Sequence, residues 1–417
     1  MPNQFILSIC IPSRNRQIWF KQTIDALRLS PRTDIQLVLA DNSDDPSIMN
    51  DFMRDLEGDP RIVYLPSTGE TLSMIDNWER TAAAATGDYM VFIGDDDYVD
   101  PDVAELIKRV LVDNPDIDAF GWRLLGYTWP HPSRGKLTVQ VPFDDSVVRV
   151  EQSELFGRMF GWIDSRHVPT SGFSVYHNAV SRKLMERIRA IYGNRYFEHP
   201  VVDYDSAFKV ICHGTRFVAT ARPFGVMGSC PASNSFGVGK FKDMREKMSI
   251  FAAEAKRDFA RDPLFREVPF TLEIGTTAAV GIAQHWYKKT YGITYENWGE
   301  NFARACAIDC ENYLDRDSFE AASEGYRTAF SLWEGGRNLP YFRPSFNELA
   351  AEKRGGVASG FTDKVVMIDQ DIPVSTPAEL FNVVRGMVTP VDMLNIPAGG
   401  LRLPRETQAR GLHLLSA

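Results

Sequence analysis

Three adjacent aspartates, Asp95, Asp96 and Asp97, follow an apolar run in the stretch "MVFIGDDDYVDPD" at residues 90–102. The four residues before Gly94 are typical of a buried strand. Three like charges repel one another, so a positive partner is needed to hold them together. Carboxylate oxygens are the ligands that Mg²⁺ and Mn²⁺ prefer. The motif therefore predicts a divalent-metal site, although adjacent acidic residues also occur in solvated loops.

Polar residues also follow two other predicted strands. The strand at 5–11 runs into "IPSRNR" at 11–16, and the strand at 35–41 ends in "LADNS" at 39–43. The carboxyl ends of parallel strands bind ligands, so we expect both stretches to lie beside the aspartates. Asp41 can accept a hydrogen bond from the ring N–H of a uracil-like base or from a ribose hydroxyl, and "DNS" is also typical of a turn. The residues that can offer backbone groups to a flat ring are Pro12, Ser13, Arg14 and Asn15.

The elements that must position these residues alternate between strand and helix. Predicted strands are 5–11, 35–41, 61–65 and 89–93, and predicted helices between them are 17–29 and 71–86. This alternation predicts an α/β fold with a doubly wound, mostly parallel sheet and helices on both faces. Further on, 118–127 and 216–227 read as strands, 136–141 and 147–150 resemble a hairpin, and 205–214 reads as a helix. From residue 240 the pattern is mainly helical, over 240–261, 270–290 and 297–333.

Composition excludes some partners. The chain has 417 residues, is 44% hydrophobic and carries a net charge of -9, so it lacks the basic face that nucleic-acid binding requires. Five cysteines without tight spacing suit reduced thiols in a cytoplasm. We see neither a signal peptide nor an apolar run that could cross a bilayer. A cytoplasmic protein is expected, and peripheral contact with the inner face of the membrane and homo-oligomer formation are both compatible with this sequence.

The sequence resembles glycosyltransferase family 2, a group of inverting GT-A enzymes that use nucleotide-diphospho-sugars. The resembling pieces occur in the family's order over roughly the first 235 residues and are "LSICIPSRNR", "IQLVLADNS", "LSMIDNWERTAAAATGDYMVFIGDDDYVDPD", "YHNAVSRKLMERI" and "VVDYDSAFKV". The resemblance implies a nucleotide-binding half, an acidic metal motif bound to Mn²⁺ or Mg²⁺, and an acceptor half with a catalytic aspartate.

The resemblance assigns roles residue by residue. Asp41 matches the acid that reads the base, and Asp96 matches the acid that holds the metal. Asp95 and Asp97 are neighbours that can reach the donor or the metal, and we take Asp95 as a donor contact and Asp97 as a second metal ligand. Pro12 and Arg14 match the loop around the nucleotide, and Ser13 and Asn15 lie in the same loop. Ser73 and Asn77 fall on the helix that passes close to the sugar.

The acceptor half supplies the expected general base. Asp203 in "VVDYDS" matches the family's base, and Asp205 is the alternative. In the family this acid usually follows another acid, whereas here it follows Val202. Asp203 could instead cap the helix that starts beside it, because Asp is a favoured N-cap. The histidines nearest to these motifs are His177 and His199.

Two departures from the family pattern bear on the metal. The family's Asp-X-Asp motif falls on Gly94, Asp95 and Asp96, so glycine replaces the first acid. A histidine that often assists the metal or the diphosphate is replaced by Cys230, a poor ligand for Mg²⁺. Either the aspartates and phosphates alone hold the metal, or other side chains contact the phosphates. The candidates for such contacts are Ser233, Asn234 and Ser235.

These residues predict transfer of a sugar, with inversion, from a nucleotide-diphospho-sugar to a hydroxyl of a saccharide or lipid-linked saccharide. UDP is the expected nucleotide, and bacterial surface polysaccharide or glycoconjugate assembly is the expected setting. The alternatives are a catalytically inactive sugar-nucleotide-binding protein and, with less support, a nucleotidyltransferase. We divide the chain into a GT-A domain at 1–238, a helical region at 239–354 and a weakly structured extension at 355–417. The GT-A domain consists of a nucleotide-sugar half, 1–127, and an acceptor half, 128–238.

Overall fold

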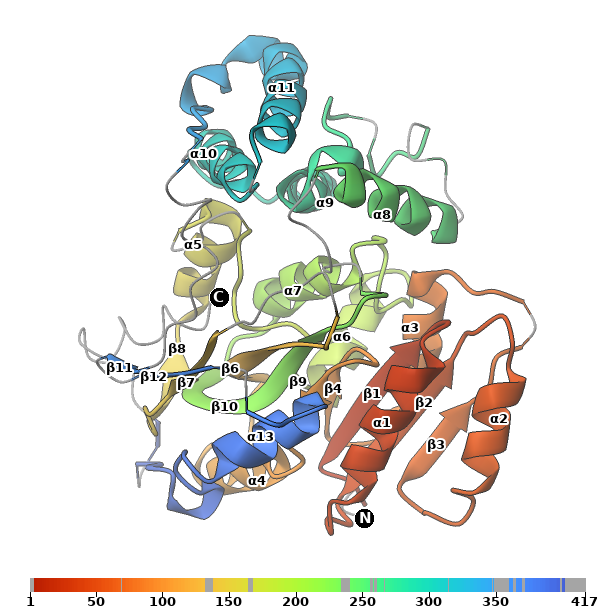
Figure 1. Ribbon diagram of the computed structural model, residues 1–417. Coiled ribbons are helices and arrows are strands. Elements are labelled where there is room, and N and C mark those ends of the chain that lie inside the picture. Colours follow the sequence, from red (N-terminus) through yellow and green to blue (C-terminus); the bar gives the residue numbers. More distant parts are fainter. Residues whose placement is uncertain are drawn as a thin grey trace.

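A nine-stranded mixed sheet organises the first part of the chain (Figure 1). The computed structural model describes residues 4–68, 70–131, 138–163, 168–233, 241–255, 258, 261–265, 267–313, 315–346, 348, 360–362, 365–369, 372–397 and 400–401. The strands of the large sheet are β1 (Leu7–Ser13), β2 (Ile35–Asp41), β3 (Ile62–Leu65), β4 (Tyr89–Phe92), β5 (Tyr98–Val99), β6 (Ala119–Thr128), β8 (Val147–Val150), β9 (Ala179–Ser181) and β10 (Phe217–Ser229).

The strand order is β3-β2-β1-β4-β9-β6-β10-β5, and β8 pairs with the free part of β10. Strands β3, β2, β1 and β4 are parallel neighbours, and β6 and β10 are also parallel to each other. Strand β9 is antiparallel to both β4 and β6, so it sits between two groups that run in one direction. The expected mostly parallel α/β sheet is therefore confirmed, with three antiparallel strands added to it.

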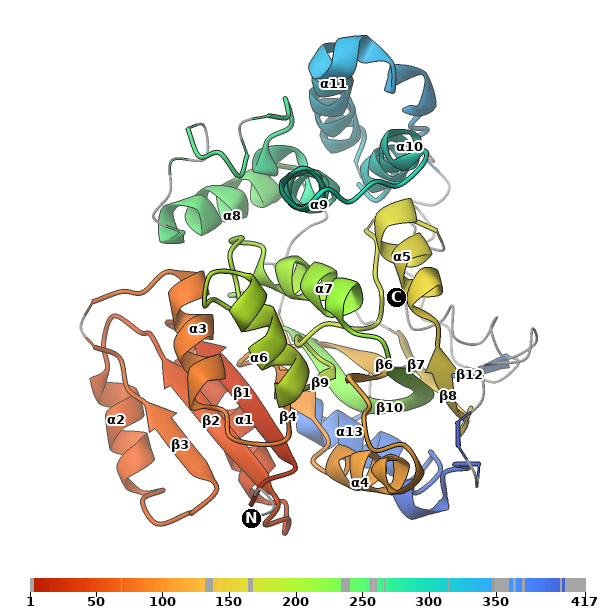
Figure 2. The same ribbon diagram turned by 180° about the vertical axis from the view of Figure 1, so that it is seen from behind.

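Helices cover both faces of this sheet, as Figures 1 and 2 show from opposite sides. One apolar core joins the sheet to α1 (Gln17–Arg28), α2 (Ser47–Arg54), α4 (Val103–Asp113) and α13 (Pro377–Arg385). A second core joins the other face to α3 (Met74–Ala84), α5 (Gln152–Gly161), α6 (Arg182–Ile191) and α7 (Val202–His213). Because every residue of β2 and β4 is buried, these strands need the continuous apolar runs seen in the sequence.

The region after the sheet is helical, as expected, and has an apolar core of its own. It contains α8 (Phe241–Glu254), η1 (Leu272–Ile274), α9 (Thr276–Tyr291), α10 (Trp298–Glu311), α11 (Arg316–Leu332), η2 (Trp333–Gly336) and η3 (Leu339–Tyr341). The predicted helix at 297–333 is divided in two, because Asp315 caps a new helix by accepting the N–H of Ser318 at 2.8 Å. Helix α9 also packs on the sheet side, where Tyr287 is buried in the second core.

The last described residues return to the first domain. Strands β11 (Gly360–Thr362) and β12 (Val365–Asp369) form a small sheet with β7 (Thr138–Pro142), and a short turn, η4 (Val391–Met393), follows α13. The predicted hairpin is wrong, because β7 pairs with β12 and β8 pairs with β10. We expected a weakly structured extension, but α13 buries Leu380, Phe381 and Val384 in the core under the sheet. The proposed domain boundaries stay a prediction.

The strand register brings the predicted loops together at one edge of the sheet. Ser13 at the end of β1 pairs with Asp41 at the end of β2, and Cys10 pairs with Phe92 of β4. The acidic loop after β4 therefore starts beside the last residues of β1. No helix in the described part of the chain has both the length and the apolar character that crossing a membrane requires.

Candidate active site

The acidic loop folds back on itself around Asp97, which is almost fully buried. Its two carboxylate oxygens accept the backbone N–H groups of Gly94 at 2.6 Å and Gly228 at 2.7 Å. Tyr176 donates its hydroxyl to the same side chain at 3.2 Å, and Nε2 of His177 lies 3.2 Å from it. Burial alone would raise the pKa of Asp97, but His177 and these N–H groups lower it below its ordinary value.

This geometry argues against Asp97 as a metal ligand, because both of its oxygens already accept hydrogen bonds. It also gives a reason for the glycine that replaces the first acid of the family motif. A Cβ atom at Gly94 would lie 2.7 Å from Oδ2 of Asp97, so a side chain there would displace the carboxylate. A Cβ atom at Gly228 would lie 1.8 Å from the carbonyl oxygen of Asp96. Strand β10 can therefore pack this closely against the acidic loop only because residue 228 is glycine.

A protein cation, Arg16, sits against the other two aspartates. Its Nη1 lies 3.2 Å from Oδ1 of Asp95 and 3.8 Å from Oδ1 of Asp96, and its Nη2 donates to the carbonyl of Ala232 at 2.7 Å. Ser13 also donates its hydroxyl to Asp95, at 2.7 Å. Burial still raises the pKa of Asp95, although Arg16 and Ser13 oppose that shift. Arg16 is thus part of the positive charge that the aspartates require.

Asp96 is the aspartate of the loop that fits a divalent ion. One of its oxygens accepts the backbone N–H of Cys230 at 2.9 Å, and the thiol of Cys230 also hydrogen-bonds to this carboxylate. Its Oδ1 lies 3.8 Å from Nη1 of Arg16. Burial and the neighbouring Asp97 and Asp95 raise the pKa of Asp96 to about 7, so a cation there would stabilise its charged form. No group of three or more acidic, His or Cys side chains suited to a metal occurs among the described residues. A site with one carboxylate oxygen, completed by phosphate oxygens of a substrate, is a normal arrangement for Mg²⁺.

Cys230 does not replace the missing histidine as a ligand. Burial and the nearby Asp96 raise the pKa of its thiol to about 12, so the thiol stays protonated at neutral pH. The protonated thiol and the backbone N–H of Cys230 both hydrogen-bond to Asp96. Ser233 lies in the following turn, where its carbonyl accepts a hydrogen bond from Lys247 of α8. Asn234 and Ser235 lie outside the described residues.

The loops after β1 and β2 are fastened to each other. Asn15, in a left-handed conformation with φ 55°, exchanges two hydrogen bonds of 2.9 Å with Asp44, and its N–H donates to Ser43 at 3.0 Å. Arg14 lies 3.5 Å from Asp44 and 3.9 Å from Glu254 at the end of α8. The side chain of Asn15 therefore holds the two loops together. We expect the partly exposed Pro12 and Arg14 to contact a ligand instead.

Among the described residues, Asp41 has an unpaired carboxylate oxygen that a ligand could bind. One oxygen accepts both the hydroxyl of Ser43, at 2.6 Å, and its N–H, at 3.1 Å. The other oxygen, Oδ2, is buried and has no hydrogen-bond partner within the described part of the chain. Burial raises the pKa of Asp41, so its charged form gains from an added donor. An N–H of a base or a ribose hydroxyl would satisfy this oxygen.

The two residues predicted on α3 have local structural roles. Ser73 caps the helix by accepting the N–H of Asp76 at 3.2 Å. Asn77 is buried and accepts Nε of Arg80 at 2.8 Å, and Arg80 in turn donates to the backbone carbonyl of Asp41 at 2.5 Å. Asn77 thus holds Arg80 against the end of β2, and contact with the sugar stays a prediction for both residues.

Asp203 lies in the first turn of α7, next to a segment that also touches the acidic loop. The N-cap of α7 is Val201, so Asp203 is not the cap, and its Oδ1 accepts the N–H of Tyr204 at 2.9 Å. Ser174 donates its hydroxyl to the carbonyl of Asp203 at 3.0 Å. Nearby in that segment, His177 donates its N–H to the carbonyl of Phe92 in β4 at 2.8 Å. Asp203 is therefore fixed relative to the carboxyl end of β4.

The electrostatics of Asp203 suit a proton acceptor. Burial raises its pKa above the ordinary aspartate value, while the N–H of Tyr204 and the nearby His177 oppose that shift. A carboxylate with a raised pKa is a stronger base when it is ionised. The same side chain is partly exposed, so an acceptor can approach it.

Asp205, the alternative base, belongs to a buried ion-pair network instead. Its Oδ2 lies 2.9 Å from Nζ of Lys209, which is fully buried and also lies 3.0 Å from Glu198. Lys209 further donates to the carbonyl of Tyr196 at 3.2 Å. A fully buried carboxylate committed to a lysine cannot reach an acceptor, so the geometry favours Asp203 over Asp205 as the base.

Lys209→Met should destabilise the fold strongly, because it leaves Asp205 and Glu198 without their cation in a buried site. We expect a loss of about 3–5 kcal/mol in the free energy of unfolding, measured by denaturant titration. Lys183→Met is the matched control, because Lys183 is 83% exposed and only 3.7 Å from Asp116. Equal unfolding free energies for the two variants would show that the network contributes nothing to stability.

Comparison with known proteins finds a family that this chain resembles. Residues 8–185 match the family model described as glycosyl transferase family 2. No curated protein that was searched matches the chain. Solved structures with similarity include Staphylococcus aureus TarS 1–349 in complex with UDP-GlcNAc, at 12% identity and a TM-score of 0.42, covering 88% of this chain and 98% of that one.

A second similar structure is the mannosyltransferase PcManGT from Pyrobaculum calidifontis in complex with GDP-Man and Mn²⁺. It is 14% identical, with a TM-score of 0.38, and the match covers 85% of this chain and 88% of that one. Both TM-scores are low, so neither likeness supports a conclusion about this chain. The family match contains β1, β2 and β4 with the loops that follow them, while Asp203 lies beyond it. The similarity to glycosyl transferase family 2 therefore extends over residues 8–185 of this chain.

Proposed function

We propose that this protein is an inverting glycosyltransferase that moves a sugar from a nucleotide-diphospho-sugar, with UDP as the nucleotide, to an acceptor hydroxyl. The family match over residues 8–185 carries the proposal, because it contains the loops that follow β1, β2 and β4, with Asp41 and Asp96. Asp41 supports the proposal, because its buried Oδ2 has no hydrogen-bond partner among the described residues and could accept a donor from a base or ribose.

The proposed reaction needs positive charge at the leaving diphosphate. The partly exposed Arg16, on the edge of the acidic loop, can donate to phosphate oxygens. Asp96 would hold Mn²⁺ or Mg²⁺ through its carboxylate, and such an ion would neutralise the charge that grows on the diphosphate. Residues Ser13 and Thr23 keep the loop in place, the latter by donating its hydroxyl to the carbonyls of Asp95 and Asp97.

Asp203 supplies the second half of the reaction. Its carboxylate takes the proton of the acceptor hydroxyl while the acceptor oxygen attacks the sugar carbon on the face opposite the diphosphate. The sugar passes through an oxocarbenium-like state, as in glycoside hydrolysis. The bond to the acceptor oxygen forms, the bond to the diphosphate breaks, and the product has the inverted configuration.

The proposal is tested directly by turnover. The full chain is incubated with UDP-sugars and GDP-sugars, Mn²⁺ and a panel of saccharide acceptors, and released nucleoside diphosphate is measured. Release that depends on an acceptor supports glycosyl transfer. The inactive-binder alternative draws support from Arg16, which already neutralises part of the acidic loop. It predicts that a nucleotide-sugar raises the melting temperature while no diphosphate is released.

Asp41→Asn should weaken UDP binding by about tenfold to a hundredfold, the usual effect of losing a hydrogen bond to a charged group. The asparagine oxygen can keep the hydrogen bonds from Ser43. Its N–H₂ group, however, replaces Oδ2, which would accept a hydrogen bond from the nucleotide. Isothermal titration with UDP measures the change.

Asp45→Asn is the matched control for this change. Asp45 makes the same kind of turn, accepting the hydroxyl of Ser47 at 2.6 Å, but it is exposed. Its variant should bind UDP as the wild type does. Unchanged UDP affinity in Asp41→Asn would mean that another residue reads the nucleotide.

The finer assignments are part of the same proposal. The acceptor is a saccharide or lipid-linked saccharide of a surface polysaccharide or glycoconjugate, and transfer takes place in the cytoplasm, with peripheral contact at the inner face of the membrane. The negative net charge of -9 is consistent with a partner other than nucleic acid.

A further inference from the structure

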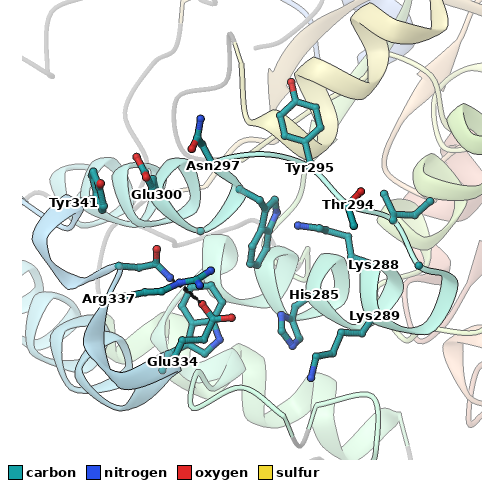
Figure 3. A pocket seen from close by; sticks show the side chains of 16 residues that line it. His285, Lys288, Lys289, Thr294, Tyr295, Asn297, Glu300, Glu334, Arg337 and Tyr341 are labelled. Carbon is teal, nitrogen blue, oxygen red and sulfur yellow. Dashed lines mark hydrogen bonds and ion pairs between the residues drawn. The ribbon is translucent and has the colours of Figure 1, made fainter.

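A large cavity lies in the helical region, and it shares no residue with the strand-end site. Its volume is about 690 Å³, within the range of known ligand sites. Figure 3 shows that it is bounded by the end of α9, the connection to α10, the first turn of α10 and the η2–η3 segment. A cavity of this size has room for several sugar rings, and nothing in the proposed reaction uses it.

Lys288 places an unusual cation in this cavity. Its Nζ lies 4.1 Å from the centre of the Trp298 ring, as a cation–π contact. Among the described residues no carboxylate pairs with it at ion-pair distance. Burial lowers the pKa of Lys288 to about 8, and Glu334 opposes that shift only from a distance. An ammonium in such a place gains from an anion that enters the cavity.

The other charged side chains around the cavity already have partners. Lys289 is paired with Glu267, Arg337 lies 2.8 Å from Glu334, and Glu300 lies 3.3 Å from Arg304. Burial is the main cause that lowers the pKa of His285 to about 4, and the positive charges of Lys289 and Lys288 lower it further. The His285 ring is therefore neutral at physiological pH. The uncompensated charge of the described lining is therefore the one on Lys288.

The start of α10 adds a second feature that favours an anion. Asn297, its N-cap, has a left-handed conformation with φ 60° and makes no side-chain capping bond. Gly299, in the first turn, has no side chain of its own, and the side chain of Asn338 packs against it. A helix N-terminus carries a partial positive charge, so a negative group beside this turn is stabilised by it as well as by Lys288.

The position of Lys288 in the last turn of α9 has a simpler explanation, which is interaction with the helix dipole. Lys289 satisfies that role equally well from the exposed surface, whereas burying an unpaired ammonium has a free-energy cost. The helix dipole therefore explains a lysine in this turn but not one that points into a cavity.

The rest of the lining is rich in groups that bond to hydroxyls. Thr294, Asn297 and Tyr341 contribute hydroxyl and amide groups to the lining (Figure 3). The ring of Tyr295 also borders the cavity, but its hydroxyl lies against Gly161 of α5. Sugar hydroxyls both donate and accept hydrogen bonds, so they match a lining that contains both donors and acceptors. A plain phosphate or carboxylate ion would leave most of these groups in water.

We propose that this cavity binds an acidic saccharide, with a carboxylate of the sugar against Lys288 and the first turn of α10 and the sugar hydroxyls on the polar lining. An acidic saccharide would then be an acceptor or a product of the proposed glycosyltransferase, and this part of the inference rests on the proposed function. Binding itself does not require turnover.

The experiment titrates the full chain with tetragalacturonic acid and with a neutral galactose tetrasaccharide, and titrates UDP in parallel. The wild type should bind the acidic tetrasaccharide more tightly than the neutral one. Lys288→Met should weaken binding of the acidic tetrasaccharide by roughly tenfold or more, the effect of losing a charged hydrogen bond, and should leave the neutral one unchanged. UDP affinity should be the same in both proteins, because the nucleotide site is separate.

Lys289→Met is the matched control, since it removes the same charge from the next residue, where the ammonium is exposed and paired with Glu267. It should change binding by no more than about twofold. Lys288→Arg keeps a cation and should recover most of the affinity, so a loss in Lys288→Met with recovery in Lys288→Arg is not a folding defect.

Three outcomes would overturn the proposal. The first is equal binding of the acidic and neutral tetrasaccharides to the wild type. The second is an unchanged affinity of Lys288→Met for the acidic one. The third is full displacement by inorganic phosphate at the same concentration, which would make the cavity a simple anion site. A failure of UDP to bind would count against the proposed function alone.

Discussion

Asp203→Asn is expected to reduce turnover by about two to four powers of ten, the usual range for removing a general base. The fold should survive, because asparagine can still accept the N–H of Tyr204 that Oδ1 accepts at 2.9 Å. Donor affinity should stay nearly unchanged, since the carboxylate acts on the acceptor and only in the transition state. Single-turnover rates and UDP titration of the same protein separate these two effects.

The pH dependence gives an independent measurement for the same residue. Burial raises the pKa of Asp203, and a general base works only when it is ionised. Activity of the wild type should therefore fall with decreasing pH as the pH passes through this raised pKa, above the ordinary aspartate value of about 3.9. In Asp203→Asn the residual activity should lack this acidic limb. A wild-type rate that is flat across this range would contradict the assignment.

Asp205→Asn distinguishes a base from a structural acid on the same helix. Asp205 is fully buried against Lys209, so its variant should lose stability while the folded fraction keeps much of its turnover. If Asp205→Asn abolished turnover in a stable protein while Asp203→Asn spared it, the base would be Asp205. If both variants kept normal turnover, the inverting mechanism would lose its main support.

The sequence predicts those parts of the fold in which the local pattern of apolar residues matches the burial of the element. Strand β2 was expected at 35–41 and occupies Ile35–Asp41, because a strand covered on both faces must be apolar throughout. Strand β9 has three residues, too few for any periodicity, and its place between β4 and β6 depends on distant pairing. Helix α13 was missed because its role is set by the core it meets, far away in sequence.

The site shows the same division between local and distant information. The strand ends with Asp41 and Asp96 were predictable, since acids after apolar runs are visible in sequence. Arg16 was missed, although it lies in the quoted loop, because its contacts are with Asp95 and with Ala232, over two hundred residues away. Asp97 was interpreted as a ligand because a sequence cannot show that Gly94 and Gly228 direct their N–H groups at it.

Asp96→Asn should lower turnover at least about a hundredfold, because a metal that neutralises the leaving diphosphate is worth several kcal/mol in the transition state. The fold should be retained, since the asparagine oxygen can accept the N–H of Cys230 and its N–H₂ group takes the place of Oδ1, 3.8 Å from Arg16. Asp97→Asn is the contrasting variant. Both of its oxygens accept backbone N–H groups, so an N–H₂ group must face a donor, and stability should fall by about 1–3 kcal/mol.

The decisive measurement for Asp96 is UDP affinity with and without Mn²⁺. In the wild type Mn²⁺ should tighten UDP binding, because Asp96 would hold the ion and the ion would neutralise charge on the diphosphate. In Asp96→Asn the two affinities should become nearly equal, while binding without Mn²⁺ is retained. If Mn²⁺ tightened UDP binding equally in the variant, Asp96 would not be the ligand. If Mn²⁺ had no effect on the wild type, and Arg16→Met abolished binding, the diphosphate would be held by Arg16 rather than by a metal.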